Sequence, residues 1–180
     1  MASENLEKIK ARIMEPDWTE NMHLELEELP DEDAKIIVDS MSEEEIFQKV
    51  NHRKFQEDYI ADYIEYLWDV SEEAYWKHIK VSLYSDEGIG LLWSSNMSHL
   101  EKMCDVEVPE DVFQAVLVFV LESTNKQDLD ALSDVIKAQV NSFSKFDEIK
   151  LFSKKIGEEF KESFLEKINS MLNAESIYEF

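Results

Sequence analysis

Residues 112–121 read VFQAVLVFVL, a run that is apolar on every side of a helix except at Gln114. A helix that is hydrophobic all round has to be surrounded by other protein. Pro109, just before the run, suits the first turn of a helix because its missing N–H is not needed there. A buried strand is the alternative for a run so rich in valine, but the chain offers few partner strands. The run therefore predicts a central core helix over residues 109–123.

The rest of the chain also has the pattern of an all-helical protein. Apolar residues recur at helical spacing over most of it, and only 3 glycines and 3 prolines occur among 180 residues, too few for the turns of a β-rich chain. We expect one all-α domain over residues 1–180 with eight to ten helices, either an α/α superhelix or an irregular bundle around the central helix. Its parts are an acidic N-terminal part (1–84), a core with C-terminal helical hairpins (96–173) and a tail (174–180).

Several residues mark where helices begin and end. Ser42 followed by Glu45 has the spacing of a capping box, and Ser71 suits the N-cap of the helix that follows it. Gly157 lies inside the last periodic run and is expected to bend or split it. Residues 85–95 hold two of the three glycines, so we expect a long connection there, with a short β-excursion as the alternative.

One segment resembles a known helical repeat. Residues 122–138, ESTNKQDLDALSDVIKA, resemble the turn and second helix of a HEAT-type repeat, in which an Asp after the turn precedes an apolar helix. The resemblance covers one repeat, without a second copy of its motif. The succession of 109–123, 127–142 and 146–173 has the helical-hairpin rhythm of an α-solenoid, which favours the superhelix over the compact bundle.

The chain is strongly acidic. Its 41 Asp and Glu against 18 Lys and Arg give a formal net charge of −23. That charge excludes nucleic acid and anionic membrane as direct ligands and suits a basic protein partner. The competing explanation for this negative charge is that it only keeps the protein soluble. However, residues 17–73 hold 19 acids against four bases, and this local excess favours a site.

Catalytic and metal-binding patterns are missing from the sequence. It has no Gly-rich phosphate loop, no GxSxG and no Cys pair for zinc, so we expect no enzyme activity, cofactor or metal, although paired carboxylates acting as acid and base stay open. Cys104 is the only cysteine, which fits a reducing compartment. The N-terminus lacks a signal-peptide pattern, and residues 112–121 are too short to span a bilayer. We expect a cytoplasmic protein.

Residues 55–70, FQEDYIADYIEYLWDV, sort into three stripes when read as a helix. One face is acidic, the opposite face is aliphatic and tyrosines run along the border between them. Like charges three or four residues apart repel each other, so stability alone does not favour an acidic row without a cation. The acidic row is Asp58, Asp62, Glu65 and Asp69, and the border row is Tyr59, Tyr63 and Tyr66.

These stripes give the candidate binding site. Carboxylates at helical spacing lie roughly 5–6 Å apart, close to the spacing of backbone phosphates, and Tyr is enriched at interface hot spots. We expect Trp68 and Trp76 to belong to the core instead. The predicted partner-binding residues are Asp58, Tyr59, Asp62, Tyr63, Glu65, Tyr66, Asp69, Glu72 and Glu73.

The triplets EDY (57–59), ADY (61–63) and IEY (64–66) resemble the acids and paired tyrosines that acidic, all-helical immunity proteins of bacterial nuclease toxins carry on an exposed helix. The resemblance, to the colicin or contact-dependent inhibition type, implies an inhibitor that blocks the basic cleft of a toxin, as a monomer or in a 1:1 complex. Length and element order differ from the small colicin immunity proteins. A phage-type DNA mimic that inhibits a defence nuclease and a helical-repeat adaptor that binds a protein or peptide are the alternatives.

Overall fold

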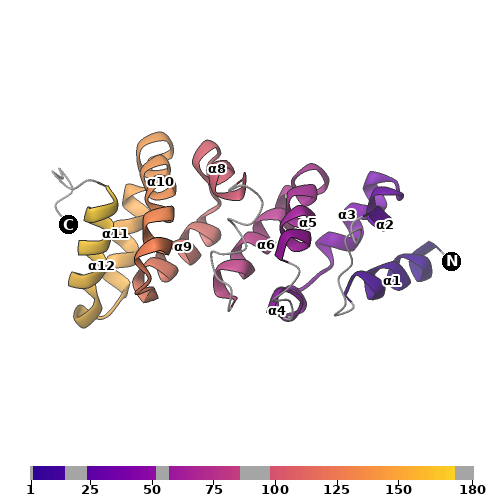
Figure 1. The fold of residues 1–180 in the computed structure, drawn as a ribbon, viewed down its shortest axis with the longest axis horizontal. Helices are drawn as coiled ribbons and strands as arrows, with labels where there is room; N and C mark the ends of the chain where they lie inside the picture. Colours follow the sequence, from indigo (N-terminus) through magenta and orange to yellow (C-terminus); the bar gives the residue numbers. More distant parts are fainter. Residues whose placement is uncertain (1, 15–23, 52–56, 86–97, 173–180) are drawn as a thin grey trace. The chain divides into compact units, whose positions relative to one another are not determined.

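The computed structural model describes residues 2–14, 24–51, 57–85 and 98–172. Most of these residues are helical and no strand occurs among them, which confirms the all-α prediction. The described helices (Figure 1) are α1 (Ala2–Ile13), α2 (Leu24–Glu27), α3 (Asp31–Asp39), α4 (Glu43–Asn51), α5 (Glu57–Val70), α6 (Glu72–Tyr84), α8 (Ser98–Asp105), α9 (Glu110–Glu122), α10 (Lys126–Phe143), α11 (Phe146–Lys155) and α12 (Glu158–Met171).

The chain forms two compact units, Met1–Met97 and Ser98–Phe180. The first contains α1 to α6 and the second α8 to α12. The expected connection at 85–95, apart from Ser85, and the expected tail at 174–180 lie outside the described residues. No helix within the described ranges has the length and apolar character needed to cross a bilayer.

In the first unit, α6 packs against α3, α4 and α5. Its Tyr75 and Ile79 are fully buried, because apolar residues recur along one side of the helix. Ser71 caps α6 as predicted, its hydroxyl accepting a hydrogen bond from the amide of Ala74. The capping box is also confirmed, since Ser42 and Glu45 exchange two hydrogen bonds of 3.1 Å. Local signals therefore set where these helices begin.

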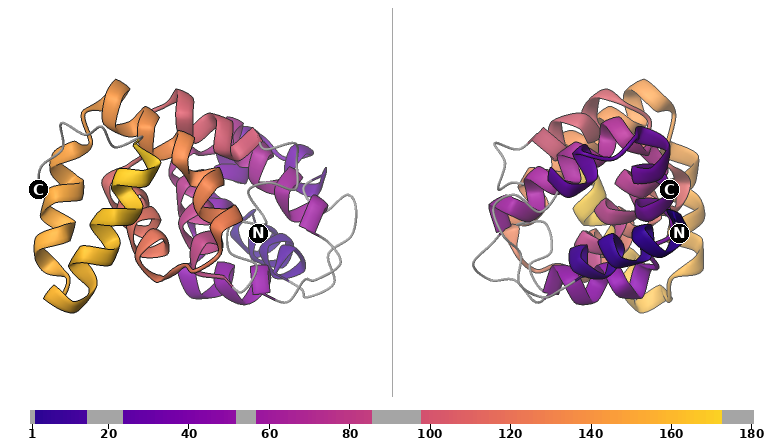
Figure 2. Two further views of the ribbon diagram at one scale, coloured as in Figure 1. Left: turned by 60° about the vertical axis from the view of Figure 1, so that its left-hand side comes forward. Right: turned by 90° about the vertical axis from the view of Figure 1, so that its right-hand side faces the viewer.

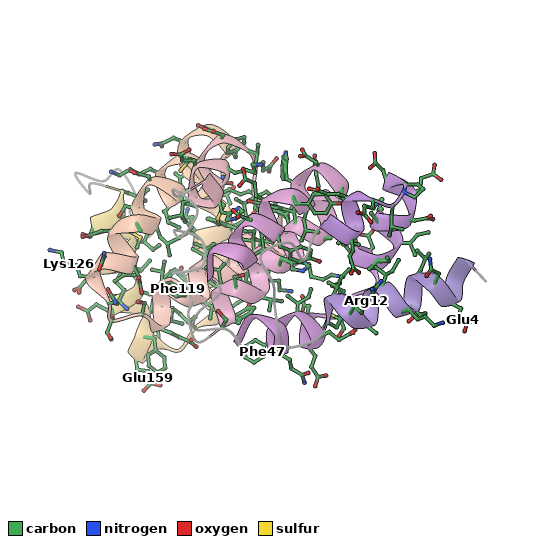
Figure 3. The ribbon with its side chains drawn as sticks, turned by 45° about the vertical axis from the view of Figure 1, so that its right-hand side comes forward. Glu4, Arg12, Phe47, Phe119, Lys126 and Glu159 are labelled. Atoms are coloured by element: carbon green, nitrogen blue, oxygen red, sulfur yellow. The ribbon has the colours of Figure 1, made fainter. Side chains whose placement is uncertain are left out.

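In the second unit, α9 is the main core helix. Six of its residues are no more than 1% exposed: Val112, Phe113, Ala115, Val116, Leu117 and Val120. Helices α11 and α12 form a hairpin (Figures 1 and 2) and both pack on α9. Phe119, which Figure 3 labels, is only partly buried, so protein does not surround this helix on every side.

The pairing of helices in the second unit differs from the predicted rhythm. Helix α10 has its main contacts with α8 and α12, whereas α9 has its main contacts with α11 and α12. The consecutive helices α9 and α10 therefore do not make the main hairpin that the HEAT-like segment predicted. Gly157 is the N-cap of α12, so of the two expected outcomes it splits the last periodic run.

Two sets of side-chain hydrogen bonds, one buried and one partly buried, join helices of the second unit. Gln139 of α10 is fully buried and bonds the backbone in the last turn of α8 and just after it. It accepts from the amide of Val108 at 3.0 Å and donates to the carbonyls of Met103 at 2.6 Å and Val106 at 2.9 Å. Lys167 of α12 donates to carbonyls at the C-terminal end of α9, where unpaired C=O groups favour a cation.

Candidate functional site

Helix α5 carries one acidic and one buried side, as its sequence predicts. Asp62, Glu65 and Asp69 are exposed, whereas Ile64 and Leu67 on the opposite side are fully buried. The two sides differ because burial of an aliphatic side chain stabilises by about 1.5–3 kcal/mol and burial of an unpaired carboxylate is strongly unfavourable. The core contact of α5 thus holds Asp62, Glu65 and Asp69 towards solvent.

The first turn of α6 adds two more carboxylates. Glu72 and Glu73 are exposed and follow the last acid of α5 across the single linking residue Ser71. We call the acidic face the set Asp62, Glu65, Asp69, Glu72 and Glu73. None of these makes an ion pair within the described part of the chain. The segment from 57 to 76 contains no Lys or Arg, so its negative charge is uncompensated from within.

Within the described residues, the predicted tyrosine row is interrupted at Tyr63, which is buried. Tyr63 is 1% exposed, its hydroxyl faces the Met41 sulfur at 3.8 Å and its ring meets the edge of His78. The prediction that Tyr63 lies at the surface is wrong, because one turn of helix brings it beside the buried Leu67. Asp58 and Tyr59 lie in the first turn of α5, with side chains outside the described residues.

Tyr66 keeps the border position that the sequence predicted. It is partly exposed. Partial burial raises its pKa, and the carboxylates of Glu27 and Asp31 raise it further. These two acids belong to α2 and α3, so they extend the negative field around Tyr66 beyond the acidic face. Sequence reasoning missed them because only the packing of α3 on α5 brings them close.

An aromatic cluster lies where α5 meets α6. The ring centroid of Trp68 is 5.1 Å from that of Tyr75 and 6.0 Å from that of Trp76, both edge-to-face. Tyr75 and Trp76 are buried, which confirms the core prediction for Trp76, whereas Trp68 is partly exposed. The cluster fixes the two helices that carry the acidic face, since edge-to-face pairs add about 0.5–1.5 kcal/mol each.

A small polar network anchors the α5–α6 corner to α3. Asp39 accepts hydrogen bonds from the hydroxyl of Ser71 and from Lys35, the latter at 2.6 Å. Burial alone raises the pKa of Asp39, but the hydrogen bonds from Lys35 and Ser71 outweigh it and hold this pKa below its usual value. Nothing in the spacing of the three residues in sequence indicated this network.

We expect the Asp39→Asn variant to lose roughly 1 kcal/mol of stability at pH 7, the usual size of such a hydrogen bond. A carboxyl whose folded-state pKa is lowered stabilises the fold above its unfolded pKa of about 4, and this contribution disappears as the pH falls through the folded value. Urea unfolding at pH 7 and below pH 4 measures the difference. Asp69→Asn, which removes an exposed acid without an ion pair, is the matched control. Equal losses in the two variants, or a loss independent of pH, contradict the network.

The acidic face is better suited to binding a positively charged partner than to catalysing a reaction. Within the described residues, no group of three or more His, Cys, Asp and Glu side chains could hold a metal ion. The carboxylates of the face are exposed to solvent and converge on no cavity among those found in the described residues. Comparison of the chain with protein-family models, curated proteins and solved structures finds no match.

Proposed function

We propose that this chain is an immunity or inhibitor protein that binds and neutralises a basic toxin, a nuclease by preference, through the acidic face. The observation that carries the proposal is the set of exposed carboxylates on α5 and α6 that make no ion pair within the described ranges of the chain. Such a face attracts an oppositely charged protein surface. A nuclease cleft is basic because it has to bind backbone phosphates.

The proposed inhibitor works by occupation, without catalysis. Carboxylates of the acidic face pair with Lys and Arg of the cleft that otherwise hold phosphates. Tyr66 and Trp68, which border the face and are both partly exposed, supply apolar contact area at its two edges. The net charge of −23 steers the encounter, so association is fast and depends on salt. The complex is proposed to be 1:1 and cytoplasmic.

Neutralising the acidic face tests the proposal. We expect Asp62→Asn/Glu65→Gln/Asp69→Asn to slow association with the toxin by about tenfold or more at low salt, with a smaller effect on dissociation, because exposed charges act chiefly on the encounter. The control Glu158→Gln/Glu159→Gln/Glu162→Gln removes the same charge from exposed positions of α12. Both variants and the wild type serve as baits in the source organism, and inhibition of the captured nuclease is then assayed.

The test requires two measurements, capture of the partner and inhibition of its nuclease activity. Preferential loss of capture and of inhibition in the α5 variant supports the proposal. If the α5 and α12 variants reduce capture and inhibition equally, the acidic residues serve solubility or general electrostatic steering and do not form a specific site. A captured partner that is neither basic nor inhibited overturns the proposal.

A phage-type DNA mimic is the second candidate, because exposed acids also occupy the first turns of neighbouring helices. Asp31 and Glu32 begin α3, and Glu44 lies in the first turn of α4. A DNA mimic uses acids over a long surface, so Asp31→Asn/Glu32→Gln/Glu44→Gln should weaken inhibition as much as the α5 variant does. If inhibition depends on the acidic face instead, this variant should lose far less of its inhibition than the α5 variant does.

A further inference from the structure

Trp68 lies where the acidic face of α5 meets the aromatic cluster between α5 and α6. It is partly exposed, although Tyr75 and Trp76, two rings that it contacts, are buried. These two rings stand at 80° and 88° to the indole, so edge-to-face packing holds it in one orientation. A large aromatic side chain that is held in place and still reaches solvent is typical of interface hot spots.

Exposed carboxylates of both helices lie beside this aromatic cluster. Glu65 is one helical turn before Trp68 on α5, so the two side chains are neighbours on the helix surface. Burial raises the pKa of Tyr75 and the Glu65 carboxylate raises it further, which places Glu65 near a second ring of the cluster. On α6, Glu72 is three positions before Tyr75 and four before Trp76. Both acids are exposed, so each helix contributes one carboxylate that a partner can reach.

An aromatic ring beside carboxylates suits a guanidinium group better than an ammonium group. The guanidinium of arginine is planar and weakly hydrated, so it stacks on an aromatic face while its N–H groups bond a carboxylate. The ammonium of lysine is compact and strongly hydrated, so it gains less from the ring. Trp gives the strongest cation–π attraction of the aromatic side chains. The surroundings of Trp68 therefore distinguish two cations that charge alone does not.

We propose that Trp68, with Glu65 and Glu72, forms an arginine-binding subsite of the acidic face, which selects a partner whose contact surface presents arginine rather than lysine. The inference rests on the proposed function, because it concerns the same face and a basic partner. It adds the kind of cation that the partner presents and the side chain that distinguishes it.

The probes are two synthetic peptides of equal charge, hexa-arginine and hexa-lysine. Both are titrated into the isotope-labelled full chain at low salt, where exposed charges are least screened, and the backbone and indole signals are followed by NMR. We expect hexa-arginine to bind about two- to fivefold more tightly, the effect of one exposed cation–π contact. It should also shift the indole signal of Trp68, which is assigned by its loss in the Trp68→Tyr variant.

Variants of Trp68 separate the effect of the ring from that of the charge. Trp68→Leu keeps an apolar side chain without an aromatic face, so the two peptides should bind about equally. Trp68→Tyr keeps an aromatic face and should retain part of the preference. The control Phe160→Leu removes an aromatic side chain that is 52% exposed in the second unit and should keep the wild-type preference. Far-UV circular dichroism checks that each variant is folded, and the comparison of the two peptides on the wild type needs no variant.

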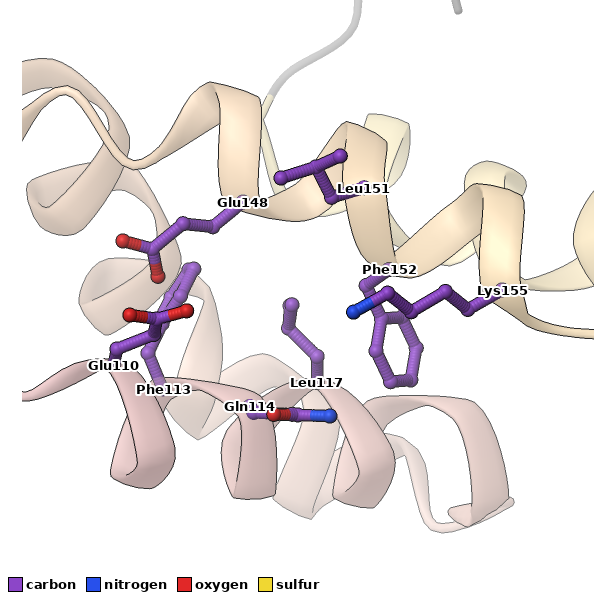
Figure 4. A pocket seen from close by; sticks show the side chains of 8 residues that line it. All are labelled: Glu110, Phe113, Gln114, Leu117, Glu148, Leu151, Phe152 and Lys155. Atoms are coloured by element: carbon purple, nitrogen blue, oxygen red, sulfur yellow. The ribbon is translucent and has the colours of Figure 1, made fainter.

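The carboxylates are tested by a second pair of variants. Glu65→Gln/Glu72→Gln removes both acids of the subsite and should weaken hexa-arginine binding by about threefold or more. The control Glu110→Gln/Glu148→Gln removes two acids whose carboxylates lie close together beside Phe113 in the second unit (Figure 4). Because Phe113 is buried, this pair offers charge without an exposed ring, and its loss should leave the arginine preference unchanged.

The outcomes separate this inference from the proposed function. Equal affinity of the wild type for the two peptides, or an arginine preference that folded Trp68→Leu retains, overturns the arginine subsite and leaves the basic partner in place. A preference without a shift of the Trp68 indole signal overturns the subsite as well. If neither peptide shifts signals of α5 and α6 at low salt, the inference and the proposed function both fall.

Discussion

Replacing Phe113 with alanine is expected to lower the free energy of unfolding by about 3–5 kcal/mol, the range for removal of a fully buried aromatic ring. Phe113 is 0% exposed in the central helix α9, which packs against α11 and α12. Its removal takes contacts from these neighbours and leaves a cavity that a three-helix contact cannot easily close. Such a loss is a large share of the total stability of an ordinary domain.

Urea unfolding, followed by tryptophan fluorescence and by circular dichroism, measures the loss of stability and shows which of the two compact units is destabilised. All four tryptophans lie within residues 1–97, so their fluorescence reports the first unit, whereas far-UV circular dichroism reports the helices of both. We expect the transition seen by circular dichroism to shift. The control Phe160→Ala removes the same side chain from a position that is 52% exposed and should change stability by less than about 1 kcal/mol. Equal effects at the two positions contradict the placement of α9 in the core.

Replacing Gln139 with leucine is the second change of large expected effect, about 2–4 kcal/mol. Leucine keeps the volume but leaves the Val108 amide and the carbonyls of Met103 and Val106 without their side-chain partner. A buried polar group that loses its partner costs about 1–3 kcal/mol. Gln127→Leu, an exposed position near the start of the same helix α10, is the matched control and should be nearly neutral.

Gln139→Glu separates hydrogen bonding from packing. A carboxylate keeps the acceptor for Val108 but places negative charge against two carbonyl oxygens in a buried site. Burial of this kind raises the folded-state pKa of a carboxyl group, so the destabilisation applies above the unfolded pKa and shrinks as the pH falls. Chemical unfolding across a pH series tests this, and a penalty that does not change with pH speaks against the bonding role of Gln139.

Many helices and several of their ends followed from the sequence because their causes are local. The spacing of apolar residues on α9 lies within one helix, and the exchange between Ser42 and Glu45 spans three residues. The same holds for the cap at Ser71 and for the break at Gly157. Each of these signals acts over about one helical turn, so a single sequence is sufficient to predict it.

The candidate site was predictable only in part. The exposure of Asp62 and Glu65 followed from their position opposite the aliphatic stripe of α5. The border tyrosines could not be separated by pattern, because a border residue is buried or exposed according to what packs beside it. Tyr63 meets Met41 and His78, whereas Tyr66 lies in the field of Glu27 and Asp31.

By itself the sequence therefore determined an all-helical chain, its core helix α9 and an acidic stripe on α5. Only the tertiary structure decided that α9 pairs with α11 and α12, that Tyr63 is buried and that Gln139 bonds the backbone more than 30 positions away. The physical reason is the distance along the sequence over which each effect acts. Propensity, periodicity and caps act between residues a few positions apart, whereas burial and polar satisfaction depend on which distant surfaces meet.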